Sequence, residues 1–238
     1  MKKFKVLFLI TVCMSIFPIT ALYAQDDEGW NYTAGADIVS GYLWRGQHLA
    51  NFSAQPEASF GYAKNDWAFS AGAWASVPFN HNDYYEIDFF VEGSWKGLGL
   101  SVSNYAESGF FAPYNDCHYL DIGLSYCLGD PVPLTFSWYT IFAGDDYRAR
   151  HQRAFSSYAE LSFDFSLWVI DFTASGGFVP FFSPYYGVDK FAVTSLALRA
   201  AYNFKEVPVM EGSMVFIGGV YNPHADRFFF EAGFGYHF

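Results

Sequence analysis

Apolar and polar residues alternate along most of the chain, and the alternation is clearest in its last stretch, residues 227–238. One parity of this stretch is apolar and mostly aromatic: Phe228, Phe230, Ala232, Phe234, Tyr236 and Phe238. Apart from Phe229, the other parity is polar or small: Arg227, Glu231, Gly233, Gly235 and His237. Successive side chains of a strand point to opposite faces, so one face of this strand is apolar and the other polar or small. This arrangement is typical of a strand in a transmembrane β-barrel.

The same period of two predicts strands along the rest of the chain. Together with the last stretch they cover residues 30–40, 52–62, 67–77, 85–92, 98–105, 118–128, 134–142, 155–165, 168–175, 192–204, 213–221 and 227–238. The segment 213–221 is the least clear because both of its parities are apolar. Pro56 cannot donate to the strand ladder, so it predicts a bulge in the second segment. We therefore predict an all-β fold, a single antiparallel up-and-down transmembrane barrel of about twelve strands.

The connections between these segments differ in length on the two sides of the predicted barrel. Those near residues 64, 96, 129 and 166 are short, although the turn at 205–211 is longer, and those near 46, 80, 110, 148, 185 and 224 are mostly longer. Bacterial barrels have short periplasmic turns and longer outer loops. The first group, and with it both ends of the barrel chain, is therefore predicted to be periplasmic.

The first residues predict export from the cytoplasm. Basic residues at the start are followed by an apolar run from Val6 to about Ile19 and by the small residue Ala24, which is the pattern of a secretory signal peptide. We predict a signal peptide at 1–24 and a barrel at 25–238. Cys13 lies in the middle of the apolar run, so a lipoprotein signal is not favoured, and Pro18 argues against an uncleaved spanning helix.

Composition and charge narrow the function classes. Hydrophobic residues make up 52% and aromatic residues 22% of the chain, yet charged and small residues are interleaved among them. Removing Lys2, Lys3 and Lys5 with the signal changes the formal net charge from −11 to −14. Such an acidic chain does not favour nucleic acid as a partner. Cys117 and Cys127 fall at the two ends of one predicted extended segment, too far apart for a disulfide.

Most acidic residues of the predicted strands have the inward parity. We predict that the lumen is lined by Asp37, Glu57, Glu86, Asp88, Glu92, Asp121, Glu160, Asp164, Asp171 and Glu231, together with Arg199 and Arg45. Carboxylates in a water-filled passage favour cations and repel anions. The hypothesis is a narrow diffusion channel for small cationic or neutral solutes. The alternative is that these acids only keep the lumen wet. Inward Trp74, Phe90, Tyr119, Tyr139 and Tyr158 determine whether the lumen is open, and the sequence leaves this undecided.

The stretch Val39-Ser-Gly-Tyr-Leu-Trp-Arg-Gly-Gln47 carries a family resemblance. With Gln55-Pro56, Gly72-Ala-Trp-Ala-Ser76 and Glu86-Ile-Asp88, it resembles the TorF-like porin family of Gram-negative outer membranes. The specific part covers roughly the first third of the mature chain. The resemblance implies an outer-membrane porin and supplies no catalytic residues. The ending Tyr236-His-Phe238 is also similar to the terminal aromatic signal that the barrel-assembly machinery recognises.

Residues of this stretch also suggest local roles. Tyr42 and Trp44 lie where the first strand would leave the bilayer, which suits an aromatic girdle. Arg45 has the inward parity and could pair with Glu57, Glu86 or Asp88. A position at the solvated rim is an equally good interpretation.

Enzymatic activity is the rival function class, and we expect no enzyme. The histidines are His48, His81, His118, His151, His224 and His237, and none lies in a His-x-Ser pattern that would suggest a hydrolase. Asp145, Asp146 and His151 could form an acid/base group. The neighbouring arginines of that loop fit a solvated rim or a contact with lipopolysaccharide better.

A structural or adhesive barrel is the third class. The predicted outer loops, such as 181–186, are short and aromatic and offer little area for a protein interface. Continuing the aromatic girdle is the simpler role for these rings. The scattered acids and histidines predict no metal or cofactor. Outer-membrane lipids and small solutes are the expected partners, and the oligomeric state is not predicted.

Overall fold

A computed structural model describes residues 28–107, 113–129, 131–204 and 208–238. The predicted signal peptide lies outside these residues. The strands of the barrel are β1 (Gly29–Val39), β4 (Ser53–Lys64), β5 (Trp67–Pro78), β6 (Glu86–Trp95), β7 (Leu98–Glu107), β8 (His118–Cys127), β9 (Leu134–Gly144), β10 (Ser157–Leu167), β11 (Ile170–Val179), β12 (Ala192–Asn203), β13 (Ser213–Asn222) and β14 (Arg227–His237). The remaining elements are the hairpin strands β2 (Tyr42–Trp44) and β3 (Gln47–Ala50), the helix α1 (Tyr114–Cys117), and the 3₁₀ turns η2 (Ala149–His151) and η3 (Pro208–Met210).

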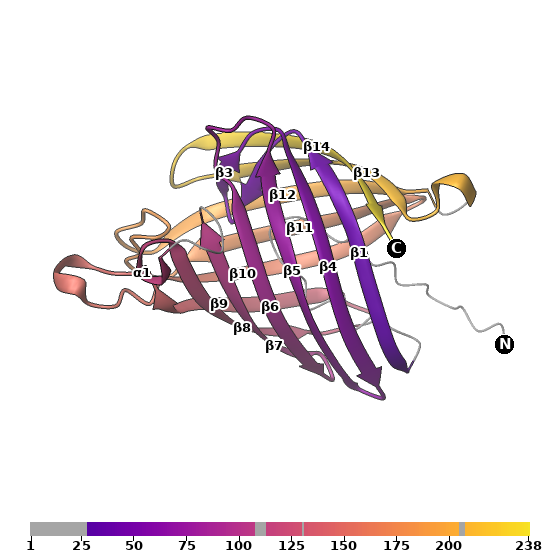
Figure 1. Ribbon diagram of the computed structural model, residues 1–238, viewed down its shortest axis with the longest axis horizontal. Helices are drawn as coiled ribbons and strands as arrows, with labels where there is room; N and C mark the ends of the chain where they lie inside the picture. Colours follow the sequence, from indigo (N-terminus) through magenta and orange to yellow (C-terminus); the bar gives the residue numbers. More distant parts are fainter. Residues whose placement is uncertain (1–27, 108–112, 130, 205–207) are drawn as a thin grey trace.

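The barrel is closed by pairing of its first and last strands (Figure 1). Every strand of the barrel pairs antiparallel with its neighbours in sequence order, apart from the excursion of β2 and β3. At the seam, Gly35 of β1 pairs with His237 of β14, and Val39 pairs with Gly233. The backbone of Phe238 continues the ladder, with its N–H 2.9 Å from the Ala34 oxygen. This confirms the predicted all-β, twelve-strand barrel.

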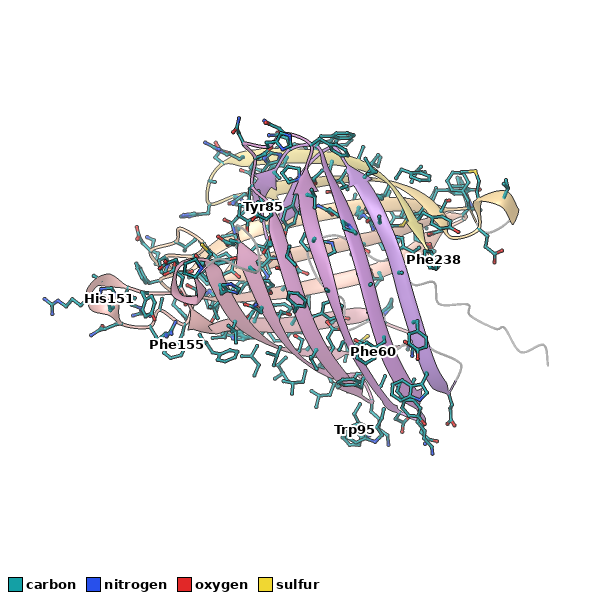
Figure 2. The ribbon with its side chains drawn as sticks, viewed as in Figure 1. Phe60, Tyr85, Trp95, His151, Phe155 and Phe238 are labelled. Atoms are coloured by element: carbon teal, nitrogen blue, oxygen red, sulfur yellow. The ribbon has the colours of Figure 1, made fainter. Side chains whose placement is uncertain are left out.

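The two faces of the sheet differ as the alternation predicts. On β6, Phe89, Val91 and Trp95 are exposed on the outer side, whereas Glu86, Asp88 and Glu92 are buried on the inner side. Figure 2 shows Phe60 and Trp95 on the outside of the barrel wall. The apolar outer belt can be stable only in a nonpolar surrounding, because the apolar side chains of such a wide belt would otherwise face water. A closed sheet leaves no strand edge without backbone partners in that surrounding.

The strand β13 resolves the ambiguous parity of its sequence. Met214 and Phe216 face the lumen and are buried, whereas Val215 and Ile217 are exposed on the outer side. Glycines opposite account for this choice. Phe216 is paired with Gly233 of β14, where a Cβ would come within 2.2 Å of the Phe216 ring. Gly72 and Gly123 face Phe90 and Tyr139 in the same way. Inward rings therefore lie over glycines of the next strand.

The connections follow the predicted asymmetry of length. Two residues join β4 to β5, β6 to β7 and β10 to β11 at the end of the barrel where the chain begins and finishes. The opposite, outer end carries most of the longer loops, although the β13–β14 connection there is shorter than the β8–β9 and β12–β13 connections at the first end. The bulge predicted at Pro56 is absent: the β4–β5 ladder has a gap at Gln55 and Pro56, but the register is the same on both sides of it. A missing N–H therefore interrupts the pairing locally without inserting a residue. Part of the 205–211 turn lies outside the described residues.

Other details complete the fold. Cys117 ends helix α1 instead of starting the following strand, and neither it nor Cys127 forms a disulfide. Among the described residues, no helix has the length and apolar character needed to cross a membrane.

Candidate functional site

The outer end of the lumen is filled by two segments of the chain. One is the β2–β3 hairpin, which leaves β1 and folds inward, and the other is the loop 180–191 between β11 and β12. Their apolar side chains pack with rings from the barrel wall in one buried cluster. We call this cluster the outer plug: Tyr42, Trp44, Ala50, Tyr105, Tyr139, Tyr158, Val179, Tyr186 and Val188. The plug therefore narrows the lumen at this end.

The tip of the hairpin is a two-residue turn that only a small residue can complete. Arg45 and Gly46 both have positive φ, at 46° and 84°, as in the type I′ turns that suit hairpins. A Cβ on Gly46 would lie 1.8 Å from the backbone oxygen of Thr194 on β12. The Asn222 side chain of β13 donates a hydrogen bond of 2.9 Å to the Gly46 oxygen. Gly46 therefore lets the hairpin tip lie directly against β12 and β13.

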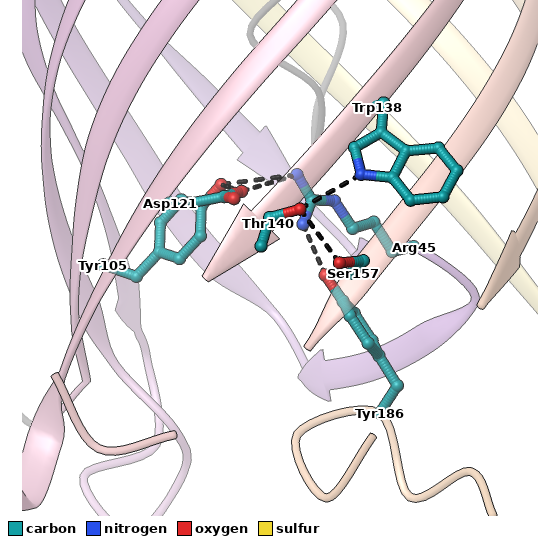
Figure 3. A network of polar contacts seen from close by, with 7 residues as sticks. All are labelled: Arg45, Tyr105, Asp121, Trp138, Thr140, Ser157 and Tyr186. Carbon is teal, nitrogen blue, oxygen red and sulfur yellow. Dashed lines mark hydrogen bonds and ion pairs between the residues drawn. The ribbon is translucent and has the colours of Figure 1, made fainter. Parts of the chain in front are cut away.

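Arg45 is held in an enclosure that we call the arginine cage (Figure 3). Its guanidinium forms an ion pair with Asp121 at 3.0 Å and donates to the hydroxyls of Tyr105 and Tyr186. Tyr105 itself donates to the same Asp121 oxygen at 2.8 Å. The cage walls are the rings of Trp44, Tyr139 and Tyr158, whose centroids lie 4.4, 4.2 and 5.1 Å from the guanidinium carbon.

The electrostatics of the cage follow from its burial. Asp121 is only 2% exposed, so solvent contributes little to balancing its charge. Burial lowers the pKa of Arg45, but the neighbouring Tyr186, Tyr105 and Asp121 outweigh this effect and keep the guanidinium charged. Burial raises the pKa of Tyr186, which remains a neutral phenol at physiological pH. The cage thus holds one buried cation against one buried anion.

These positions correct three predictions. Arg45 pairs with Asp121, and not with Glu57, Glu86 or Asp88, because it projects from a hairpin that crosses the lumen to the opposite wall. Tyr42 and Trp44 do not join an aromatic girdle: they are 2% and 6% exposed inside the plug. Within the loop 181–186, Tyr185 and Tyr186 likewise turn inward onto Trp44, although Phe181 stays exposed.

The predicted inward acids Glu86 and Asp88 lie beside the arginine cage, next to Tyr42 and Tyr105. The Tyr42 hydroxyl donates to Glu86 at 2.9 Å, and Asp88 is paired across the strands with Tyr105. Glu86 is directly opposite Glu107 on β7. Sequence reasoning missed Glu107, Tyr84 and Tyr185, which share this region. Glu107 continues the inward parity of its strand, so a strand drawn two residues longer would have included it.

The other predicted lumen residues are spread along the inner wall. Glu160 accepts a hydrogen bond from Tyr158 at 2.9 Å, and Asp164 accepts one from Thr173 at 2.6 Å. Asp171 accepts hydrogen bonds from Ser166 and Asn203. Glu57, Glu92, Glu231 and Arg199 also occupy inward positions, with Glu57 half-buried and the other three buried.

Two of the lumen positions tie strands together. Asp37 contacts His237 at 2.8 Å across the β1–β14 seam. The Arg199 guanidinium lies 3.9 Å from the ring centroid of Phe216 on the neighbouring strand. The predicted lumen residues are therefore not gathered into one site, except at the outer plug.

The inward rings named from sequence mostly belong to the plug. Tyr139 and Tyr158 are part of its buried cluster, Trp74 packs on Tyr42, and Tyr119 packs on Tyr185. Phe90 lies lower, over Gly72. The narrowing that the sequence left undecided is thus concentrated at the outer end.

The histidines and the charged loop have separate partners. His118 lies 3.1 Å from Asn104, and His48 stacks on Phe229. Asp146 binds the backbone and hydroxyl of Ser156, whereas His151 packs against Tyr147 near the tip of its loop (Figure 2). Among the described residues, no group of three or more His, Cys, Asp or Glu side chains is arranged to hold a metal ion.

Comparisons with known proteins add little to this geometry. No protein-family profile matches the chain, and no curated protein matches it. Among solved structures, it is similar to a mutant porin of Rhodopseudomonas blastica, with a TM-score of 0.38 and 11% identity over 89% of this chain and 99% of that one. It is also similar to the outer membrane protease OmpT of Escherichia coli, with a TM-score of 0.26 and 10% identity over 88% and 91% of the two chains. Likenesses this weak do not bear on function.

Proposed function

We propose that this protein is an integral outer-membrane channel for small hydrophilic solutes, cationic or neutral, whose narrowest part is the outer plug. The observation that carries the proposal is the charge of the inner wall. Carboxylates occupy inward positions on most strands, whereas the two arginines named there are engaged, Arg45 with Asp121 and Arg199 with the Phe216 ring. A wall of this sign attracts cations and repels anions.

Planar-bilayer recording tests the channel directly. With purified full-length barrel and a KCl gradient across the membrane, we expect small openings whose reversal potential favours potassium over chloride. Glu92→Gln, on the inner wall, is expected to lower the preference for potassium. Glu211→Gln removes the same charge from an exposed turn and serves as the matched control. A chloride preference, or equal effects of the two variants, would contradict the proposed selectivity.

A barrel without an open pore is the alternative that the plug itself favours. Replacing the hairpin residues 42–50 by a short Gly/Ser linker is expected to enlarge the conductance, because the plug loses Tyr42, Trp44 and Arg45 together. If neither the wild type nor this variant conducts, the channel proposal fails. Incubation with labelled phospholipid or peptide tests the remaining alternative of a rim hydrolase, and we expect no turnover.

Several further assignments belong to the same proposal. The sequence resemblance supports an assignment to the TorF-like porins, and Tyr236 with Phe238 would serve as the assembly signal read by the barrel-assembly machinery. Both rings lie on the outer face at the end of the last strand, 5.9 Å apart, where such a signal would be accessible. Arg148 and Arg150, exposed in the loop 145–156, would contact the phosphates of lipopolysaccharide.

A further inference from the structure

A second enclosure lies next to the arginine cage, and we call it the acid cage. It contains three carboxylates, Glu86, Asp88 and Glu107, and the hydroxyls of Tyr42, Tyr84 and Tyr185. Tyr185 donates to Glu107 at 3.1 Å, and Tyr84 is hydrogen-bonded to Glu86 and Glu107. The Tyr42 ring packs on Trp74 and Tyr84, with centroids 5.2 and 6.4 Å away.

The acid cage has the chemistry of the arginine cage without its cation. Both combine buried carboxylate, phenol hydroxyls and aromatic faces, and Tyr185 and Tyr186 contribute one ring to each. Among the described residues, no ion pair joins Glu86, Asp88 or Glu107 to a Lys, Arg or His side chain. Like charges directly opposite each other, as at Glu86 and Glu107, destabilise a sheet. A cation between them would remove this repulsion.

Asp88 gives an independent sign that a partner is missing. Its side chain is 2% exposed and is hydrogen-bonded to the Glu86 carboxyl and to the backbone of Ala106, yet its Oδ1 atom has no hydrogen-bond partner among the described residues. A buried polar atom without a partner is uncommon because its desolvation is not compensated. A hydrogen bond between two carboxyl groups also requires a proton between them. A bound cation would satisfy Oδ1 and make that proton unnecessary.

The residues of the acid cage differ in exposure. Glu86 and Asp88 form its buried base, whereas Glu107, Tyr84 and Tyr185 are only half-buried. Burial raises the pKa of Tyr84 and of Tyr185, so both remain neutral phenols that can donate hydrogen bonds. The negative charge of the cage therefore comes from its carboxyl groups, and a ligand would approach them past the two rings.

We propose that the acid cage binds the ammonium or guanidinium group of an organic cation that enters from the outer side. The chain itself shows how such a group is held, since Arg45 is bound by carboxylate, phenols and ring faces in the adjoining cage. Ring faces favour organic cations, and the described acidic groups are not arranged for a metal ion. The inference names a solute class for the proposed channel and rests on that proposal, but binding is measured without transport.

Calorimetric titration of the folded barrel in a non-ionic detergent tests this site. The probes are methylguanidinium and propylammonium chloride at constant ionic strength, with the uncharged isostere methylurea and with CaCl₂ as comparisons. We expect the two organic cations to bind at least about tenfold more tightly than methylurea. The double variant Glu86→Gln/Asp88→Asn is expected to weaken binding about tenfold or more. Equal binding of methylurea, or displacement of the organic cations by calcium at lower concentration, would overturn the proposal.

Matched variants separate the site from the general charge of the lumen. Glu92→Gln neutralises another inward carboxylate of β6 outside the acid cage, and it should change binding less than about twofold. An equal loss in Glu92→Gln and in the double variant would show a diffuse effect of charge and reject the site. If the double variant does not fold, as judged by its electrophoretic shift on heating, Tyr185→Phe replaces it, with Tyr186→Phe as its control. A barrel that binds methylguanidinium but does not conduct would refute the channel and leave the site standing.

Discussion

The arginine cage and the acid cage are neighbours built from the same kinds of side chain, and they differ in what fills them. Tyr105 of the first and Glu107 of the second are two residues apart on β7. Tyr186 and Tyr185 belong to one loop. In the first cage the chain supplies Arg45 against Asp121, whereas in the second no ion pair to the carboxylates is present among the described residues. The difference separates a structural use of this chemistry from a binding use.

Magnitudes indicate what each part of the plug contributes. A buried ion pair is often close to neutral for stability, because desolvation offsets the attraction of the charges. Burial of an aromatic side chain contributes roughly 1.5–3 kcal/mol, and the hairpin buries both Tyr42 and Trp44. Ring burial therefore holds the hairpin in the lumen, and the pair of Arg45 with Asp121 determines where its tip lies.

The largest expected effect comes from removing the cation of the arginine cage. Arg45→Met leaves Asp121 buried without a partner, which is expected to destabilise the barrel by about 3–5 kcal/mol. Urea unfolding in detergent, followed by tryptophan fluorescence, measures the loss. The double variant Arg45→Met/Asp121→Leu should recover most of it, because no uncompensated charge remains. A double variant as unstable as Arg45→Met would show that the unpaired charge of Asp121 is not the cause of the lost stability.

The next prediction concerns the close approach of the hairpin tip, at Gly46, to the backbone of β12. Gly46→Ala places a Cβ against the Thr194 oxygen at a residue with φ of 84°, and we expect a loss of about 1–3 kcal/mol together with a larger conductance. Gly187→Ala is the matched control, because its φ is also positive, at 64°, but nothing lies within 4 Å of the added Cβ. Equal effects in the two variants would attribute the loss to backbone strain alone.

The alternation of apolar and polar residues predicts which side chains of the barrel wall face inward, but it misplaces the residues of the outer plug, and the reason is physical. Residues such as Glu92 and Phe89 belong to strands whose two faces meet different surroundings, so each parity reports one surrounding. Trp44 and Arg45 belong to a short hairpin outside the barrel sheet, and the same rule places them on a wall they do not form. Arg45 meets Asp121 only because the closed barrel brings β8 opposite β1. The pair Arg45-Gly46, followed by the polar residues Gln47 and His48, is not one of the usual sequence signals of a two-residue hairpin, and the inward direction of the hairpin depends on its close approach to Thr194.

The neighbouring residues Tyr185 and Tyr186 each contribute one hydroxyl, the first to the acid cage and the second to the arginine cage. Removing each hydroxyl in turn therefore compares the two cages. Tyr186→Phe removes a hydrogen bond to the buried guanidinium of Arg45. Because this partner is charged, we expect the free energy of unfolding to fall by about 1.5–3 kcal/mol. Tyr185→Phe removes a bond to Glu107, which is half-buried, and the expected loss is about 0.5–1.5 kcal/mol because solvent can replace it. Both are measured by urea unfolding without ligand. The reverse order would mean that the acid cage, and not the arginine cage, holds the loop 180–191 in place.

The smallest expected effect without ligand is that of Asp88→Asn. It removes one of several like charges and retains a polar side chain, so stability should change by less than about 1 kcal/mol, and an increase is the favoured direction. Methylguanidinium should then distinguish the proteins. At ten times its dissociation constant it would stabilise the wild type by about 1.4 kcal/mol, through binding to the folded state alone, and Asp88→Asn by much less. Unfolding curves with and without methylguanidinium measure both quantities. A large destabilisation by Asp88→Asn alone would mean that its carboxylate already has a cationic partner, as Asp121 does, and the two cages would then no longer differ in kind.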